Sequence, residues 1–281
     1  MSLYQRWRKQ WRPQHAALVL PDGHVVTYET LHKRVCCCAH WLGQRGIRSG
    51  DVVALQLPKH PLQLELHLAL LAMGSTTLPM NPQYTPEEVR FLLRDAGAVL
   101  AILGDDAPDP GIPFARLGDV VSTTEAPLPE VLPPSTQAVL CYTSGTTGQP
   151  KGAMIHQGAL ESCVESLHGA WGWSEDDVLV HALPLFHIHG LFVAQHGALR
   201  AGATAVWLDR FTPDGAYRAI EDHAATVFMG VPTYYHRMLA GPDTPSMPTM
   251  RLFTSGSAPL SSQAHQQFAA RFGHVILERY G

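Results

Sequence analysis

Residues 142–152 read Tyr142-Thr143-Ser144-Gly145-Thr146-Thr147-Gly148-Gln149-Pro150-Lys151-Gly152, directly after a short apolar run. Glycines allow backbone angles and close approaches that a side chain would block. Hydroxyl groups and oriented backbone amides can donate hydrogen bonds to an anion, and the single lysine can neutralise its charge. The stretch therefore predicts a phosphate-binding loop. The alternative is a flexible polar hairpin, because the same residue types are common in turns, but such a turn requires neither the lysine nor so many hydroxyls.

The loop does not fit the Walker A pattern, which needs a second glycine before its lysine and a hydroxyl residue after it. When the pattern is started at Gly145, Pro150 takes the place of the second glycine and Gly152 takes the place of the hydroxyl residue. Starting at Gly148 fails as well. The sequence thus indicates a phosphate loop of another class.

Composition narrows the range of functions. The chain has 281 residues, which is near the size at which single cores divide into domains. A hydrophobic content of 46% with 16% charged residues supports a substantial core. The formal net charge of -4 argues against a nucleic-acid binder that relies on attraction to phosphates. No uninterrupted apolar run reaches the ~18 residues of a membrane span, so no stable membrane insertion is expected.

The first fifteen residues are basic and contain two tryptophans, Trp7 and Trp11, without any acidic residue. Two interpretations are open: a targeting or membrane-surface segment, or a helix docked on the protein. The segment is short and lacks the apolar stretch of a signal peptide, which favours the docked helix.

The five cysteines fit neither a zinc site nor a disulfide framework, because no C-x-x-C pair exists and three of them are consecutive. Free thiols in a reducing, cytoplasmic environment explain them. The histidines at positions 181, 187, 189 and 196 match no zinc spacing either.

Hydrophobic periodicity and turn residues predict strands that alternate with helices, which is typical of an α/β protein with mostly parallel sheets. Strands are expected at 15–20, 25–28, 52–57, 74–79, 98–103, 177–183, 203–208, 225–229, 251–255 and 275–277. Helices are expected at 29–42, 61–73, from Thr85 onward, and at 158–169, 191–199, 213–223, 232–239 and 261–272. A proline-rich connection, 105–134, with one short strand near 113–117, joins subregions of about 15–104 and 135–281.

In open α/β sheets, ligand sites gather outside the carboxyl ends of the strands. The distinctive polar segments of this chain follow predicted strands or, for 143–152, the apolar run 138–140. They are 143–152, His187, 230–233, 256–259 and Tyr280-Gly281.

Together these segments resemble the adenylate-forming superfamily, which includes acyl-CoA synthetases, firefly luciferase and peptide-synthetase adenylation domains. The resemblance rests on residues 142–152, on Pro184-Leu185-Phe186-His187 and on Glu278-Arg279-Tyr280-Gly281. It covers the chain from about His15 to the end. It implies the layered α-β-α-β-α N-terminal domain of those enzymes, and it implies an acyl-adenylate made from a carboxylate and ATP, followed by thioester formation with coenzyme A.

The resemblance also assigns roles to individual residues. The phosphate loop would hold the β- and γ-phosphates of ATP, with Thr143 also contributing to a Mg²⁺ site. Tyr280 would stack on the adenine, and His187 would lie beside the carboxylate that is activated. A histidine that only satisfies polar groups at a strand end is the alternative for His187. The nucleotide-binding set is Thr143, Ser144, Gly145, Thr146, Thr147, Gly148, Lys151, Ser257, Ala258, Pro259, Glu278, Tyr280 and Gly281, of which Ser257 would also touch the acid.

Within the superfamily, residues 183–193, 229–237, 251–260 and 277–281 are most similar to malonyl-CoA synthetases. The resemblance places Arg237 at the distal carboxylate of malonate, and a guanidinium offers a planar fork that matches a carboxylate. A surface arginine on an amphipathic helix is the alternative. The sequence does not separate malonate from methylmalonate, because one methyl group changes discrimination by only ~1–3 kcal/mol, and it leaves the oligomeric state open.

Several superfamily features lie outside these 281 residues: the Thr-Glu pair after Tyr-Gly, an aspartate for the ribose, and the C-terminal domain with its catalytic lysine. The expectation is therefore a partial N-terminal AMP-binding domain of a longer malonyl-CoA-forming enzyme, weak or inactive alone. Two alternatives stay open. One is a medium- or long-chain fatty acyl-CoA synthetase, and the other is a non-catalytic nucleotide-binding fragment.

Overall fold

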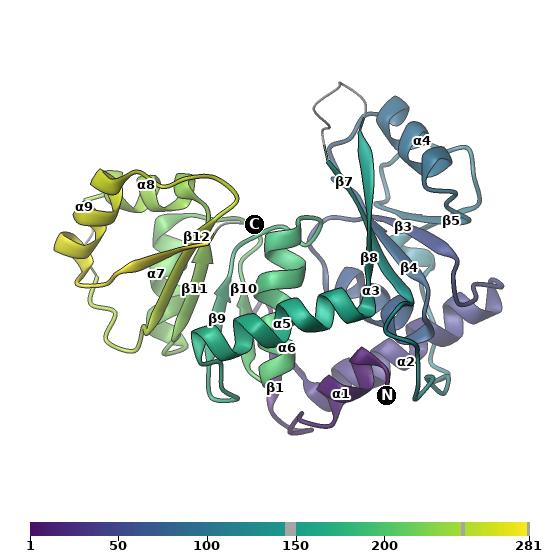
Figure 1. Cartoon of the computed structure of the whole chain (residues 1–281), viewed down its shortest axis with the longest axis horizontal. Coiled ribbons are helices and arrows are strands. Elements are labelled where there is room, and N and C mark those ends of the chain that lie inside the picture. Colours follow the sequence, from purple (N-terminus) through teal and green to yellow (C-terminus); the bar gives the residue numbers. More distant parts are fainter. Residues whose placement is uncertain (144–149, 243–244, 280–281) are drawn as a thin grey trace. The chain divides into compact units, whose positions relative to one another are not determined.

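The computed structural model describes residues 1–143, 150–242 and 245–279 of the chain (Figure 1). These residues form two compact units. Unit 1 comprises 1–9 and 29–163, and unit 2 comprises 10–28 and 164–281. Neither unit is one continuous stretch, because the segment 10–28 belongs to unit 2 although residues on both sides of it belong to unit 1.

Unit 1 contains a six-stranded sheet in the order β6-β5-β3-β4-β7-β8, in which every pair is parallel except the hairpin β7–β8. Its strands are β3 (Val52–Gln56), β4 (Thr76–Pro79), β5 (Leu100–Leu103), β6 (Phe114–Arg116), β7 (Gln137–Thr143) and β8 (Lys151–His156). Its helices are α1 (Leu3–Arg8), α2 (Tyr28–Gln44), α3 (Pro61–Met73), α4 (Pro86–Asp95), the short 3₁₀ turn η1 (Leu117–Asp119) and the first half of α5 (Gln157–Trp171).

Helix α4 illustrates how sequence signals set the element ends in unit 1. Thr85 accepts a hydrogen bond from the Glu88 amide at 3.3 Å, and the Glu88 carboxylate accepts one from the Thr85 amide at 2.7 Å. This reciprocal capping box satisfies two amides that would otherwise lack partners, and Pro86 at the first helical position needs none. The helix buries Val89, Leu92 and Leu93 against the sheet, which forms the core of this part of the unit.

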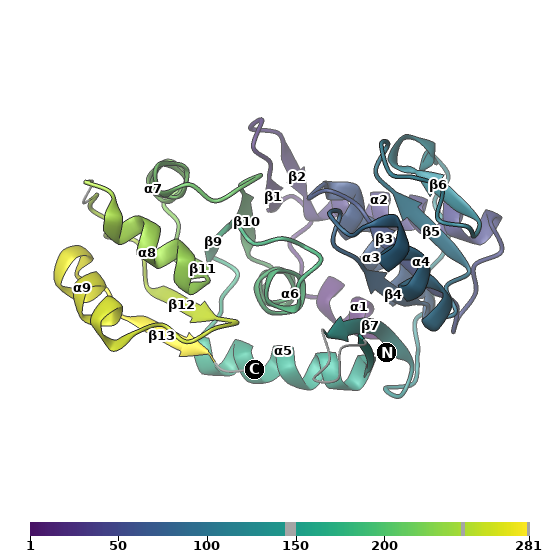
Figure 2. The same ribbon diagram turned by 90° about the horizontal axis from the view of Figure 1, so that it is seen from above.

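Unit 2 contains a seven-stranded sheet in the order β13-β12-β11-β9-β10-β1-β2, parallel except for the hairpin β1–β2. Its strands are β1 (Ala16–Val19), β2 (Val25–Thr27), β9 (Val178–His181), β10 (Thr204–Trp207), β11 (Val227–Gly230), β12 (Leu252–Gly256) and β13 (Ile276–Arg279). Its helices are the π-helical segment η2 (His189–Gln195), α6 (His196–Ala201), α7 (Pro213–Asp222), α8 (Pro232–Ala240) and α9 (Ser262–Phe272). Helices α7, α8 and α9 cover one face of β9 and β11–β13 and enclose an aromatic-rich core with Phe228, Tyr235, Phe253 and Phe268 at its centre (Figure 2).

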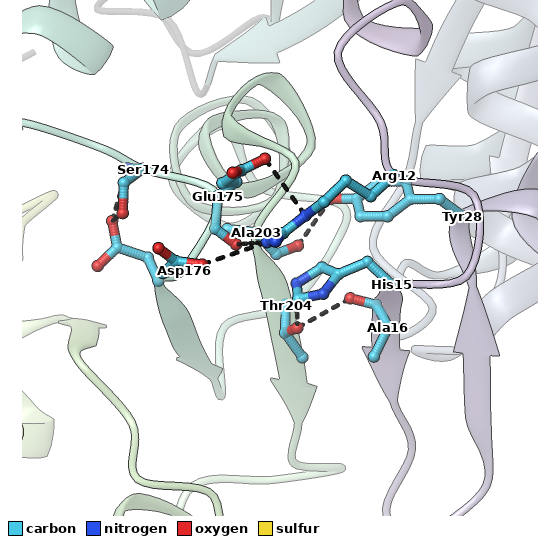
Figure 3. Close-up of polar contacts among 10 residues, drawn as sticks. Arg12, His15, Ala16, Tyr28, Ser174, Glu175, Asp176, Ala203 and Thr204 are labelled. Atoms are coloured by element: carbon cyan, nitrogen blue, oxygen red, sulfur yellow. Dashed lines mark hydrogen bonds and ion pairs between the residues drawn. The ribbon is translucent and has the colours of Figure 1, made fainter.

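The N-terminal hairpin is fixed in unit 2 by side-chain bonds to the main chain of distant elements (Figure 3). The Tyr28 hydroxyl donates to the Ala203 carbonyl at 2.6 Å, and the Thr204 hydroxyl donates to the Ala16 carbonyl at 2.8 Å. Arg12 extends toward the acidic pair that precedes β9, at 3.2 Å from Glu175 and 3.3 Å from Asp176. Strand β1 therefore occupies an interior position of a sheet whose other parallel strands come from the second half of the chain.

The basic N-terminal segment is a docked helix. Leu3, Tyr4 and Trp7 of α1 are buried, and Trp11 donates from its ring nitrogen to the Leu199 carbonyl at 2.7 Å. The apolar side chains that a membrane surface would need are thus used for internal packing. The five cysteines are free, as expected. Among the residues that the structure describes, no helix is long and apolar enough to span a membrane.

The predicted α/β class with mostly parallel sheets is confirmed, and two local expectations need correction. Strand β8 was not anticipated, because its residues are largely exposed and show no apolar alternation; only main-chain pairing with β7 makes it a strand. The helix expected at 191–199 is instead the π-helical η2 followed by α6. A Cβ at Gly190 would lie 2.0 Å from the Pro184 carbonyl oxygen, so this wide helical segment begins at a very close backbone approach.

Candidate active site

The predicted site residues are distributed over both units. Unit 1 carries Thr143 at the end of β7 and Lys151 at the start of β8, which are paired across the hairpin. Both are exposed, and no ion pair is recorded for Lys151 within the described residues. The expected phosphate-binding residues Ser144, Gly145, Thr146, Thr147 and Gly148 lie outside the described residues.

Strand β7, which precedes the predicted phosphate loop, is anchored by Tyr142, whose hydroxyl donates to the Asp95 carboxylate at 2.5 Å. Burial raises the pKa of Tyr142, and the hydrogen bond to Asp95 and the charge of that carboxylate raise it further, so the hydroxyl stays a donor. The Tyr142 ring also lies close to Gly152, its partner on β8, since a Cβ at Gly152 would lie 3.2 Å from the Tyr142 Cζ atom. Tyr142 thus connects the loop-bearing hairpin to the end of α4, a contact that sequence reasoning did not find.

The variant Tyr142→Phe is expected to lower the free energy of unfolding by about 1 kcal/mol, because it removes one hydrogen bond to a charged group at a partly exposed position. Urea denaturation of Tyr142→Phe, Asp95→Asn and the double variant measures the coupling. The cycle is needed because Asp95, at the end of α4, interacts unfavourably with the helix dipole, so its replacement alone has a mixed effect. Losses that add without coupling would show that the contact contributes nothing.

Unit 2 carries the acid-site candidates at the carboxyl ends of its parallel strands. His187 follows β9 and is exposed, with its ring 4.3 Å from that of Phe186. Partial desolvation lowers the pKa of His187, so the imidazole is neutral at pH 7. A neutral imidazole can donate a hydrogen bond to a carboxylate without forming an ion pair with it.

Arg237 is exposed on α8 and is held by the loop after β10. Its Nη1 donates to the Phe211 carbonyl at 3.3 Å, and its guanidinium carbon lies 5.3 Å from the centre of the Phe211 ring. The Tyr234 ring stacks on the Phe211 ring, with the two ring centres 3.9 Å apart and the ring planes tilted by only 6°. The Tyr234 hydroxyl donates to the Ala182 carbonyl at the end of β9. The guanidinium is thus positioned by an aromatic stack and keeps donors available to a ligand.

The segment Ser257-Ala258-Pro259 is an exposed loop directly after β12. Ser257 has a φ of +71°, which is unusual for a residue with a side chain. Its hydroxyl lies 3.4 Å from the Nδ1 atom of His189. The predicted ligands Tyr280 and Gly281 lie outside the described residues, whereas Glu278 is described and bonds to the Leu260 amide at 2.8 Å.

His189 is the site residue that sequence reasoning missed, since it was considered only as a metal ligand. It is 4% exposed, and burial together with the nearby charge of Arg279 lowers its pKa to about 4. Its Nε2 atom has no hydrogen-bond partner among the described residues. The available signal was the neighbouring Gly190, whose backbone closely approaches Pro184. No group of three His, Cys, Asp or Glu side chains within the described ranges could hold a metal ion.

The sequence profile of the AMP-binding enzyme family matches residues 5–281. The chain belongs to this family. Among curated members, the mouse protein named mitochondrial malonate–CoA ligase ACSF3 is 29% identical over 94% of this chain and 51% of its own length. A feruloyl-CoA synthase of an Amycolatopsis species is 31% identical over 95% of this chain and 56% of its own length.

Solved structures of the AMP-binding family agree with the fold. The apo form of MatB from Rhodopseudomonas palustris superimposes with a TM-score of 0.93 at 34% identity, covering 100% of this chain and 59% of MatB. The ATP-bound form of MatB gives the same TM-score at 35% identity. The chain spans about half the length of the curated relatives it matches.

Proposed function

We propose that this chain is the nucleotide-binding part of an acid–thiol ligase that uses ATP to convert a small carboxylic acid into a coenzyme A thioester. The observation that supports the proposal most is the match of the AMP-binding family to residues 5–281, with the phosphate-loop sequence 142–152 inside it. A carboxylate oxygen attacks the α-phosphorus of ATP, the bond to pyrophosphate breaks, and an acyl-adenylate results. The thiol of coenzyme A then attacks the acyl carbonyl, and AMP leaves.

In this proposal, Lys151 and the hydroxyls of the loop neutralise and orient the β- and γ-phosphates. Lys151 suits the role because it is exposed and lies opposite Thr143 at the mouth of the hairpin. The Thr143 hydroxyl fits Mg²⁺, a hard cation that prefers oxygen ligands and is commonly held by few protein groups together with substrate phosphates. When bound, Mg²⁺ supplies further neutralisation of phosphate charge.

His187 orients the carboxylate in unit 2. Because desolvation keeps the imidazole neutral, it holds the acid by a hydrogen bond and leaves the carboxylate nucleophilic. Ser257, Ala258 and Pro259 offer an exposed surface after β12 for the adenine. An alternative is a nucleotide-binding protein without catalysis, which would bind ATP and release no pyrophosphate in any form of the protein.

Malonate is the substrate that we propose. The Arg237 guanidinium is held against Phe211 and remains exposed, so it can offer its planar fork to a second carboxylate. The names of the relatives include malonate, oxalate and sulfoacetate, which all carry a second anionic group, and also feruloyl, which does not. A fatty acid, the alternative substrate, would gain nothing from a cation at this position.

The variant Arg237→Ala tests the substrate in the longest form of the protein that can be expressed. We expect malonate-dependent pyrophosphate release to fall roughly thirtyfold in kcat/KM, about 2 kcal/mol, with little change for acetate. Arg218→Ala, which removes an exposed arginine on the adjacent helix α7, is the matched control and should leave both acids unaffected. Equal losses for malonate and acetate would refute the distal-carboxylate role.

The 281-residue chain alone is expected to release pyrophosphate slowly, and rapid turnover by it would contradict that expectation.

A further inference from the structure

The loop from Gly256 to Leu260 is held in a conformation that its sequence does not favour. Ser257 adopts a φ of +71°, in the left-handed region that is unfavourable for a residue with a Cβ. Such a conformation persists only where surrounding contacts impose it. Two contacts of this kind lie at the two ends of the loop.

The first contact is at Gly256 and Ser257. A Cβ added at Gly256 would lie 3.2 Å from the His189 Cε1 atom and 3.4 Å from the Arg279 carbonyl oxygen, so only glycine fits without displacement. The Ser257 hydroxyl lies 3.4 Å from His189 Nδ1. These contacts fix where the chain leaves β12.

The second contact is at Leu260 and comes from Glu278 on β13. Strands β12 and β13 are parallel, and Ser255 pairs with Glu278 in their register. This register brings the carboxylate to the far end of the loop, where Glu278 Oε1 accepts a hydrogen bond from the Leu260 amide at 2.8 Å. The other oxygen, Oε2, lies 3.7 Å from His265 Nε2 on α9. One carboxylate oxygen is therefore bonded to the loop, and the other faces His265 on α9.

We propose that Glu278 is a positioning residue that holds the loop 256–260 in its strained form for the adenine, and that it does not contact the nucleotide itself. The inference rests on the proposed nucleotide site. It concerns the conformation of the loop before ATP binds and not the chemical reaction. It assigns to the glutamate of the Glu-Arg-Tyr-Gly segment a role in pre-organising the base-binding surface. Binding then does not have to order the loop, which is how pre-organisation raises affinity.

Hydrogen exchange tests the clamp without any ligand. In Glu278→Ala, the Leu260 amide loses its partner, and we expect its exchange in the 281-residue chain to become about tenfold faster, since one charge-assisted hydrogen bond at a partly exposed position is removed. Glu278→Gln retains an acceptor oxygen and should keep most of the protection. Glu221→Ala, on the exposed face of α7, is the control and should leave the Leu260 amide unchanged. Unchanged exchange in Glu278→Ala would overturn the clamp, whether or not the chain binds ATP.

Calorimetric titration with ATP tests the consequence for binding. We expect Glu278→Ala to weaken ATP roughly tenfold and Glu278→Gln to weaken it much less. Ser257→Gly relieves the strain, because glycine adopts positive φ without penalty. In the Ser257→Gly background the loss caused by Glu278→Ala should therefore be clearly smaller. An equal loss in both backgrounds, or a loss in Glu278→Gln as large as in Glu278→Ala, would show that Glu278 acts as a nucleotide ligand and would overturn the proposal. If the unmodified chain fails to bind ATP, the proposed function fails, while the exchange result still decides the clamp.

Discussion

Replacing Asp177 by alanine is expected to lower the free energy of unfolding by about 3 kcal/mol, because it removes the buried acceptor of four hydrogen bonds. Asp177 is 2% exposed and accepts two hydrogen bonds from Arg251, at 2.7 and 2.6 Å. It also accepts from the Thr226 hydroxyl at 2.7 Å and from the Ser174 amide at 2.8 Å. Asp177, Thr226 and Arg251 immediately precede β9, β11 and β12, so one carboxylate joins the starts of three adjacent strands.

Urea denaturation measured by tryptophan fluorescence checks the prediction. The neighbouring residue provides the matched control: Asp176 is 83% exposed and contacts only Arg12, at 3.3 Å, in the described structure. Asp176→Ala should change stability by no more than about 0.5 kcal/mol, as is typical of a surface ion pair. Similar losses in the two variants would mean that burial of Asp177 has little energetic consequence. The expected loss is no larger because the Arg251 side chain is 37% exposed, so water can solvate its charge when the partner is removed.

The same carboxylate should make stability depend on acidic pH. Burial by itself would raise the pKa of Asp177, but the hydrogen bonds from Arg251, Thr226 and Ser174 and the charge of Arg251 outweigh burial and hold the pKa below its usual value. Its contribution is therefore complete above the unfolded pKa of about 3.9 and is lost as the pH falls through the lower folded pKa. Between pH 5 and pH 3, the urea midpoint of the unmodified chain should fall more steeply than that of Asp177→Asn. Parallel profiles would contradict this assignment.

The second large effect is expected for Gly190→Ala. A Cβ at Gly190 would lie 2.0 Å from the Pro184 carbonyl oxygen and 3.1 Å from the Leu183 Cβ atom. Because the nearest atom is backbone, it cannot rotate away, and the turn from β9 into η2 must open. We expect a loss of about 3 kcal/mol or more in unfolding free energy, at the upper end of overpacking effects. The displacement should also move His189 away from Ser257, because His189 directly precedes the altered residue.

Gly169→Ala is the control for Gly190→Ala. Gly169 lies in helix α5, and a Cβ there would meet nothing within 4 Å. Alanine should therefore leave stability unchanged or raise it by up to about 1 kcal/mol, the difference between the two helix propensities. Urea denaturation compares the two variants directly. A small effect of Gly190→Ala, comparable to that of Gly169→Ala, would show that the turn tolerates a wider geometry.

Local signals in the sequence sufficed for most helices and strands. Helix α3 begins at Pro61 and ends before Gly74, which has a φ of 77°, and both residues are recognisable start and stop signals. Buried strands such as β3 and β11 are short apolar runs, as expected for parallel strands covered on both faces. Strand β8 could not be predicted because its residues are largely exposed and show no apolar alternation. The π-helical η2 could not be predicted because a π-helix has no distinctive hydrophobic periodicity.

For the candidate site, the sequence likewise indicated the residue types, whereas the contacts between them became visible only in the structure. The residue types suited to phosphate binding could be recognised from the chain alone, because 142–152 combines glycines, hydroxyls and a cation within one short stretch, and their role as a phosphate site stays a prediction. The contacts that position them were not accessible. Tyr142 meets Asp95 across 47 positions of the sequence, and Ser257 meets His189 across 68.

For this protein, the sequence by itself determined the α/β class and the family, and it predicts a phosphate loop at 142–152, since each depends on residue types at short and fixed spacing. Only the tertiary structure decided that Tyr142 bonds to Asp95, that Glu278 bonds to the Leu260 amide, and that residues 10–28 complete the sheet of unit 2. The physical reason is that strand register and side-chain packing join segments far apart in the chain. No local pattern specifies which partner a hydroxyl or a carboxylate will meet.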